Sequence, residues 1–176
     1  MSKAEFNIVS LAEHSQYIDI VVAYLYARWS SIVGRDIEEV RSWFLPQLGE
    51  EINNSDHPYQ IQQTFIATLS NKTKTVPVGM ASVAQMNQSM KEKVAHIANI
   101  NENDAMLFSV FTNEAYRGKG FGNKLVERSE EYAQQNNAKN MVLDSSTEGL
   151  KLYQNRQYIP IRNSSGQHSM TMYKPL

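Results

Sequence analysis

The chain contains no cysteine among its 176 residues. This absence excludes disulfide bonds, thiolate metal sites and a cysteine nucleophile. An excess of one charge is also missing, because 17 Lys and Arg stand against 18 Asp and Glu, which gives a formal net charge of −1. We therefore expect no nucleic-acid partner. The histidines lie too far apart for metal-ligand spacing, so no metal site is predicted.

Long hydrophobic runs are absent as well. The longest, near residues 18–27, is too short to cross a bilayer, and the N-terminal residues 1–7 lack the apolar core of a signal peptide. These features predict a cytoplasmic protein with no membrane partner. The length, together with a hydrophobic content of 41%, predicts a single domain over residues 1–176.

The order of apolar patterns predicts an α+β fold with layers around one sheet. Strands are expected at 6–11, 63–69, 76–86, 106–112, 140–143, 158–162 and 169–173. Helices are expected over 18–29, from Asp36 onward, over 123–135 and over 145–153. Residues 87–104 form a long loop or a short helix.

Two helix boundaries follow from local signals. Asp36 is expected to cap a helix whose inward face is Ile37, Val40, Phe44 and Leu48, and Pro46 is expected to kink or end it. Ser145 and Glu148 have the spacing of a capping box at the start of the last helix.

The glycine-rich segment Tyr116–Gly122 is the most informative part of the chain. It lies between the apolar run 106–111 and the helical pattern that follows, so a strand leads through a glycine turn into a helix. Such a turn directs backbone N–H groups toward one point at the positive end of a helix dipole. A helix start without a ligand would favour a Ser or Asp cap, because glycine costs a helix about 1 kcal/mol relative to Ala. The turn is therefore interpreted as a diphosphate site.

Three phosphate-binding patterns can be compared with this turn. A Walker-type loop requires a Gly-Lys-Ser/Thr ending, which is missing. A dinucleotide fold requires G-x-G-x-x-G; here the third glycine comes one residue early, although Asp144 lies about 20 residues further on. The third pattern, Arg-x-x-Gly-x-Gly, is matched by Arg117, Gly120 and Gly122. An NAD-dependent oxidoreductase thus stays a less favoured alternative.

The segment from Val110 to Leu125 resembles the acetyl-CoA signature of the GNAT superfamily of N-acetyltransferases. Residues 152–158 resemble that family's second signature, and residues 78–82 resemble the preceding strand. The resemblance covers roughly residues 60–162. Two positions depart from the pattern: Gln157 replaces the usual Gly, and Ser146 replaces a frequent Asn.

The resemblance implies a mixed, mostly antiparallel central sheet flanked by helices. Acetyl-CoA would lie in a cleft between two splayed parallel strands that end at Thr112 and Asp144. Lys119 and Lys124 are candidates for the ribose phosphate. The implied cofactor-binding residues are Val110, Phe111, Thr112, Arg117, Gly118, Lys119, Gly120, Phe121, Gly122, Asn123, Ser146 and Tyr153.

The resemblance also implies catalytic roles. The backbone N–H of Val110 would stabilise the oxyanion, and the Tyr153 phenol would act as general acid toward the leaving thiolate. The general base is left open: Glu102 and Asp104 are weak candidates, and Glu114 and His96 are weaker ones.

The predicted function is transfer of acetyl from acetyl-CoA to a primary amine, by direct attack in a ternary complex. The acceptor is a small molecule or a peptide amine of unknown identity. A non-catalytic acyl-CoA sensor or interaction module is the alternative. An edge strand near the C-terminus suggests a possible homodimer.

Overall fold

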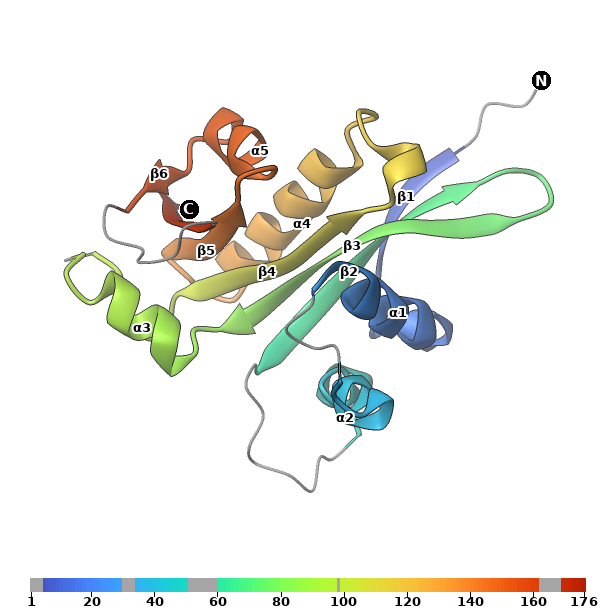
Figure 1. Ribbon diagram of the computed structural model, residues 1–176, viewed down its shortest axis with the longest axis horizontal. Helices are drawn as coiled ribbons and strands as arrows, with labels where there is room; N and C mark the ends of the chain where they lie inside the picture. Colours follow the sequence, from blue (N-terminus) through green and yellow to red (C-terminus); the bar gives the residue numbers. More distant parts are fainter. Residues whose placement is uncertain (1–4, 30–33, 51–59, 98, 162–168) are drawn as a thin grey trace.

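The computed structural model describes residues 5–29, 34–50, 60–97, 99–161 and 169–176, and a single mixed sheet organises them (Figure 1). Its seven strands follow the order β1-β2-β3-β4-β5-β7-β6, and every neighbouring pair is antiparallel except β4 with β5. The predicted mostly antiparallel sheet with one parallel pair is thereby confirmed. The strands are β1 (Glu5–Ser10), β2 (Ile61–Ser70), β3 (Thr75–Gln85), β4 (Ala105–Thr112), β5 (Asn140–Ser146), β6 (Ile159–Pro160) and β7 (Ser169–Pro175).

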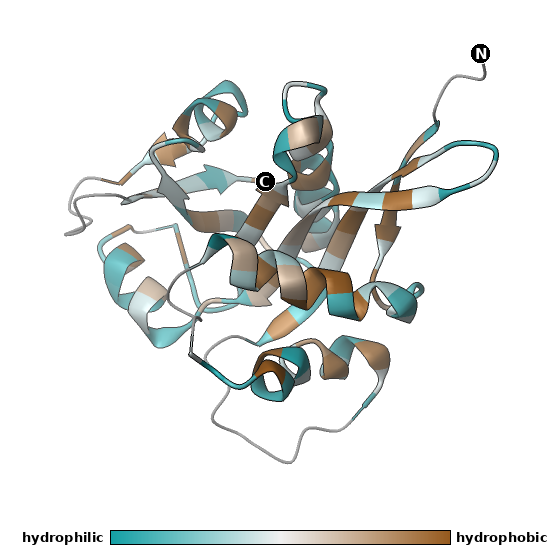
Figure 2. Cartoon of the chain, turned by 45° about the vertical axis from the view of Figure 1, so that its right-hand side comes forward, coloured by the Kyte–Doolittle hydropathy of each residue, from teal (hydrophilic) through white to brown (hydrophobic). Residues whose placement is uncertain are grey.

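Helices cover both faces of the sheet, and each face has its own hydrophobic core. On one face, α4 packs Leu125 and Val126 against Phe65 and Leu107. On the other, α1 and α2 contribute to a core that includes Ile66 of β2. Figure 2 shows hydrophobic colour concentrated on the central strands, whereas the tip of the β2–β3 hairpin is hydrophilic. The helices are α1 (Ile18–Arg28), α2 (Ile37–Ser42), α3 (Gln88–Val94), α4 (Phe121–Gln135) and α5 (Leu150–Asn155), with short 3₁₀ helices η1 (Ser15–Tyr17), η3 (Leu45–Leu48) and η4 (Glu114–Tyr116).

The parallel strands β4 and β5 separate soon after they meet. Their register joins only two pairs of residues, Ala105 with Met141 and Met106 with Val142. Beyond this point β4 is paired with β3 alone, and that ladder contains a register shift where Ser109 adopts φ 54°. A β-bulge of this kind bends the strand and locally disrupts its pairing. The divergence creates the opening in which the site lies.

The glycine turn leads directly into α4. Gly118 and Gly120 adopt φ 74° and 86°, a left-handed conformation that glycine reaches without steric penalty. Gly120 is the N-cap residue, and no side chain among the described residues caps the first turn of α4. The free N–H groups of that turn are therefore available to an anion.

The other end of the site depends on how α5 terminates. The N–H of Gln157 donates to the carbonyl of Gln154, and the N–H of Tyr158 donates to the carbonyl of Tyr153, each at 3.0 Å. These two bonds form a Schellman motif, in which the residue after the C-cap is left-handed. Here that residue is Gln157, with φ 68°, so Gln occupies a conformation that Gly adopts more easily.

Several boundary predictions were wrong in detail. Ile37 is 58% exposed because it begins the first turn of α2 on its outer side. Pro46 does not end α2, which stops at Ser42; the proline instead lies in the first turn of η3. The Asp36 cap is confirmed, since its carboxylate accepts from the N–H groups of Glu38 and Glu39.

The capping box predicted at Ser145 and Glu148 does not form. Ser145 still belongs to β5, and its hydroxyl donates to the carbonyl of Ser146 at 2.8 Å, so α5 begins only after Gly149. The long segment before β4 contains α3, capped by Asn87. The strand at the C-terminal edge of the sheet is the two-residue β6 rather than β7, and Pro160 removes a donor there. The sequence also predicts a turn at 163–166, between the last two strands, but these residues lie outside the described part of the chain.

Candidate active site

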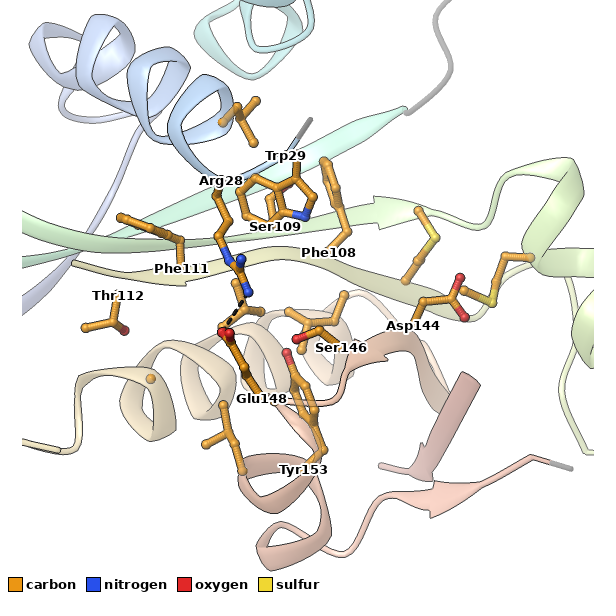
Figure 3. A pocket seen from close by; sticks show the side chains of 18 of the residues that line it. Arg28, Trp29, Phe108, Ser109, Phe111, Thr112, Asp144, Ser146, Glu148 and Tyr153 are labelled. Atoms are coloured by element: carbon orange, nitrogen blue, oxygen red, sulfur yellow. Dashed lines mark hydrogen bonds and ion pairs between the residues drawn. The ribbon is translucent and has the colours of Figure 1, made fainter. Parts of the chain in front are cut away.

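A cavity of about 570 Å³ lies where β4 and β5 diverge (Figure 3). Its walls come from the end of α1, from α3, from β4 and β5, and from α5. Seven of the residues that the sequence predicted for the site line this cavity: Val110, Phe111, Thr112, Arg117, Gly122, Ser146 and Tyr153. The fold therefore brings together residues from the glycine turn, the bulged strand and the last helix.

The glycine turn closes against the end of β4. The Arg117 Nε donates to the carbonyl of Thr112 at 3.1 Å, which fixes the guanidinium beside the start of α4. A Cβ added to Gly122 would meet the Thr112 Oγ1 at 3.7 Å, an ordinary contact, so Gly122 is not required by internal packing. A glycine that packing does not require is consistent with close approach of a ligand to the backbone.

Other predicted cofactor residues lie outside the described lining of the cavity. Phe121 is buried and packs edge-on against Phe6, with ring centroids 4.8 Å apart. Lys119 lies over the Tyr116 ring at 5.3 Å, and Lys124 forms an ion pair with Glu127. Gly118 and Gly120 lie in the glycine turn, and Asn123 lies in the first turn of α4.

Tyr153 combines burial with a hydroxyl that faces the cavity. Only 7% of the residue is exposed, and Figure 3 shows its oxygen pointing toward Ser146. Burial raises the pKa of the Tyr153 phenol, because the phenolate would lose its solvation. The ring packs edge-on against Tyr158, with centroids 5.5 Å apart, directly at the Schellman turn. Tyr153 is thus a fixed, neutral hydrogen-bond donor.

The bulge in β4 places backbone groups beside this donor. Ser109 and Val110 fall between the ladder pairs Ser82–Phe108 and Met80–Phe111, and both residues line the cavity. The side chain of Phe111 packs on Tyr24 at 4.6 Å between centroids, which anchors the strand beyond the bulge. Backbone N–H groups on a rigid bulge can stabilise negative charge that develops nearby.

The structure does not bring the general-base candidates into the cavity. Asp104 is 2% exposed, and its carboxylate accepts backbone N–H groups of Asn101, Lys139 and Asn140 at 2.8–2.9 Å and the Asn140 side chain at 2.8 Å. These bonds tie the start of β4 to the start of β5, which is a structural task. The described lining of the cavity also omits Glu102, Glu114 and His96.

Two charged pairs that the sequence analysis missed cross the cavity. Arg28 at the end of α1 donates to Glu148 at 2.8 Å, and this bond spans the cleft (Figure 3). Lys93 of α3 pairs with Asp144 of β5 at 2.5 Å. Strand alternation could have placed Asp144 on the same face as Ser146, but no local signal marks the long-range partners.

Comparisons with known proteins identify the family of the chain. The sequence matches the Acetyltransferase (GNAT) family over residues 37–157, and the chain belongs to that family. Comparison with curated protein sequences gives no significant match. Among the described residues, no helix has the length and apolar character needed to cross a membrane.

Solved structures share the fold at low sequence identity. One is a chain of the NatC complex bound to Gag peptide and CoA, with 17% identity, a TM-score of 0.65 and coverage of 99% of each chain. An acetyltransferase from Streptococcus agalactiae has 19% identity, a TM-score of 0.59 and coverage of 97% of this chain and 98% of its own. A GCN5-related N-acetyltransferase from Ralstonia eutropha has 16% identity, a TM-score of 0.57 and coverage of 93% and 97%.

Proposed function

We propose that this protein transfers an acetyl group from acetyl-CoA to a primary amine by direct attack in a ternary complex. The observation that carries the proposal is a single cavity lined by Tyr153, by Val110 of the β4 bulge, and by Arg117 and Gly122 of the glycine turn. Membership of the acetyltransferase family and the CoA-bound NatC neighbour support acyl-CoA as the donor.

The residues of the turn fit a nucleotide diphosphate. The first turn of α4 presents N–H groups that no described side chain caps, and Arg117 adds positive charge beside them. Val110 and Thr112 lie on the part of β4 that β5 leaves unpaired, so their backbone groups can pair with the pantetheine amides as an added strand would. When bound, acetyl-CoA supplies an activated acyl thioester.

The chain's own groups then perform two tasks, and water a third. The Val110 N–H is proposed to donate to the acyl oxygen as its negative charge develops. The Tyr153 hydroxyl is proposed to donate its proton to the leaving sulfur, for which it is suited because burial keeps it neutral. The acceptor is proposed to release its proton to water, because neither Glu102 nor Asp104 belongs to the described lining and its two carboxylates, Asp144 and Glu148, are both in ion pairs.

The test begins with binding and then measures turnover. The thermal midpoint is recorded with acetyl-CoA, CoA and NAD in parallel. A ligand at 100 times its dissociation constant stabilises the folded state by about 2.7 kcal/mol. We expect acetyl-CoA and CoA to raise the midpoint and NAD to leave it unchanged. A larger shift with NAD would contradict the proposal and favour a dinucleotide enzyme.

Turnover is followed by thiol release with a panel of small and peptide amines. Tyr153→Phe is expected to lower kcat about 100-fold while leaving the acetyl-CoA shift intact, because it removes a donor without altering shape. Tyr132→Phe is the matched control: this tyrosine is half-buried on α4 and is not part of the described lining. Binding of acetyl-CoA without turnover of any amine would instead identify an acyl-CoA sensor.

A further inference from the structure

The side-chain ammonium group of Lys93 lies in the wall of the cavity. The Lys93 Nζ of α3 lies 2.5 Å from the Asp144 Oδ2, and the other carboxylate oxygen accepts the Thr171 hydroxyl at 2.6 Å. Lys93 and Asp144 both line the cavity that contains Tyr153. Asp144 is thus a fixed carboxylate that already holds a primary ammonium inside the candidate active site.

The wall beside Asp144 is apolar. Val142 lies two residues earlier on the same face of β5, and it packs with Met90 and Met106 in a cluster that Phe108 also contacts. Met90, Met106 and Phe108 line the cavity, as do Trp29 and Trp43. Figure 3 shows Asp144 at one end of the pocket and Trp29 and Phe108 on the side of the opening away from Tyr153. The surface next to the carboxylate therefore suits a hydrophobic group.

The charges of the lining restrict what can bind there. The described lining residues include three basic side chains, Arg28, Lys93 and Arg117, and two carboxylates, Asp144 and Glu148. Glu148 pairs with Arg28 at 2.8 Å, but its side chain is 68% exposed, whereas Asp144 is more enclosed and is also held by Thr171. An acceptor with several positive charges would meet more basic than acidic groups, whereas one with a single ammonium needs only Asp144.

The internal pair can be displaced. About one third of each side chain is exposed, 34% for Lys93 and 33% for Asp144. An ion pair that water reaches contributes little to stability, and the flexible lysine stem can turn toward solvent. An incoming ammonium can replace Lys93 while the Thr171 hydroxyl keeps Asp144 in position.

We propose that Asp144 binds the ammonium of the acceptor, that Lys93 occupies its place in the free protein, and that the acceptor is a primary amine attached to a bulky apolar group. The acetylation of such an amine rests on the proposed function. Binding of the amine at Asp144 can be measured without acetyl transfer, so the proposed function and this inference can fail separately.

The experiment is calorimetric titration of the full chain, without acetyl-CoA, using 2-phenylethylamine as the probe. Asp144→Asn is expected to weaken binding at least 10-fold, and Lys93→Met is expected to strengthen it several-fold because the internal competitor is gone. The uncharged probe 2-phenylethanol should bind weakly and equally to all variants. Asp19→Asn removes an exposed carboxylate from another ion pair, with Arg41, and should bind the amine as the unmodified protein does.

Equal affinity of Asp144→Asn and the unmodified protein for 2-phenylethylamine would overturn the inference. So would weaker binding by Lys93→Met, because Lys93 would then contact the ligand instead of competing with it. Thermal midpoints verify that both variants fold. If acetyl transfer occurs, the KM values for the amine should follow the same order with kcat little changed. Absence of turnover in the unmodified protein refutes the proposed function, whereas the titration still decides this inference.

Discussion

Replacing Gln157 by Gly is expected to stabilise the protein. Gln157 adopts φ 68° in the Schellman turn after α5, and it is exposed, so its side chain contributes little packing. A residue with a Cβ in the left-handed region is disfavoured relative to glycine by about 1–2 kcal/mol. The turn bears on the proposed function because it holds Tyr158 against Tyr153.

The expected net effect is smaller than the relief of strain. Glycine gains freedom in the unfolded chain, which offsets about 0.5–1 kcal/mol of that relief. The free energy of unfolding should therefore rise by about 0.5–1 kcal/mol. For a chain of this length, this corresponds to an increase in Tm of about 2 °C.

The assay is thermal unfolding followed by circular dichroism, with urea titration as a second measurement. Asn137→Gly is the matched control. Asn137 has φ 66° in the equivalent turn after α4 and is also exposed, but Asn tolerates the left-handed region, so its replacement should change little. An equal gain in both variants, or no gain in Gln157→Gly, would refute the argument from side-chain strain.

Two further predictions concern buried groups. Glu130 is 9% exposed at its side chain and binds Arg156 at 2.6 Å and Lys174 at 2.9 Å; Glu130→Gln should lower the free energy of unfolding by about 3 kcal/mol in urea titration, because both partly buried cations lose their partner. Glu127→Gln, in an exposed pair, should stay within about 0.5 kcal/mol, and an equal loss in both variants would contradict the reasoning. The value of kcat/KM for an amine should rise with pH, because only the neutral amine can attack. Because burial raises the pKa of Tyr153, its phenol stays protonated at alkaline pH, so kcat/KM should show no decline below about pH 10. A descending limb between about pH 7 and 9 that Tyr153→Phe abolishes would show that the phenol titrates there instead.

One end of the cavity was predictable because its residues are close in the sequence. The glycine turn, with Arg117 and Gly122, was recognised from its own residues, whereas Val110 and Thr112 were implied by the family resemblance; all four residues lie within one strand–turn–helix unit and line one cavity. The departure at Gln157 was also visible in the sequence, and the turn retains its left-handed geometry with Gln in place of Gly. Helix and strand positions followed from periodicity, since buried and exposed residues alternate at fixed intervals.

Contacts between distant segments decided two outcomes that the sequence alone could not predict. Asp104 lies at the start of a central strand, where a catalytic carboxylate could lie, but its carboxylate accepts hydrogen bonds from the backbone N–H groups of Lys139 and Asn140. Ser145 has capping-box spacing, but β5 extends through it to Ser146, so the helix starts later. Neither outcome has a local signal, because each depends on pairing between segments far apart in the chain.

The two ends of the cavity also differ in whether their contacts are local in the sequence or join distant segments. At the proposed donor end, Arg117 bonds to Thr112 within one local unit. At the proposed acceptor end, Asp144 meets Lys93, 51 positions away, and Thr171, 27 positions away. Among the described residues, Arg117 and Asp144 have no hydrogen-bond or ion-pair partner in common, so substitutions at one end need not disturb the other. A family can therefore keep its donor site while the acceptor site changes, which is why the acceptor has to be inferred from the folded protein.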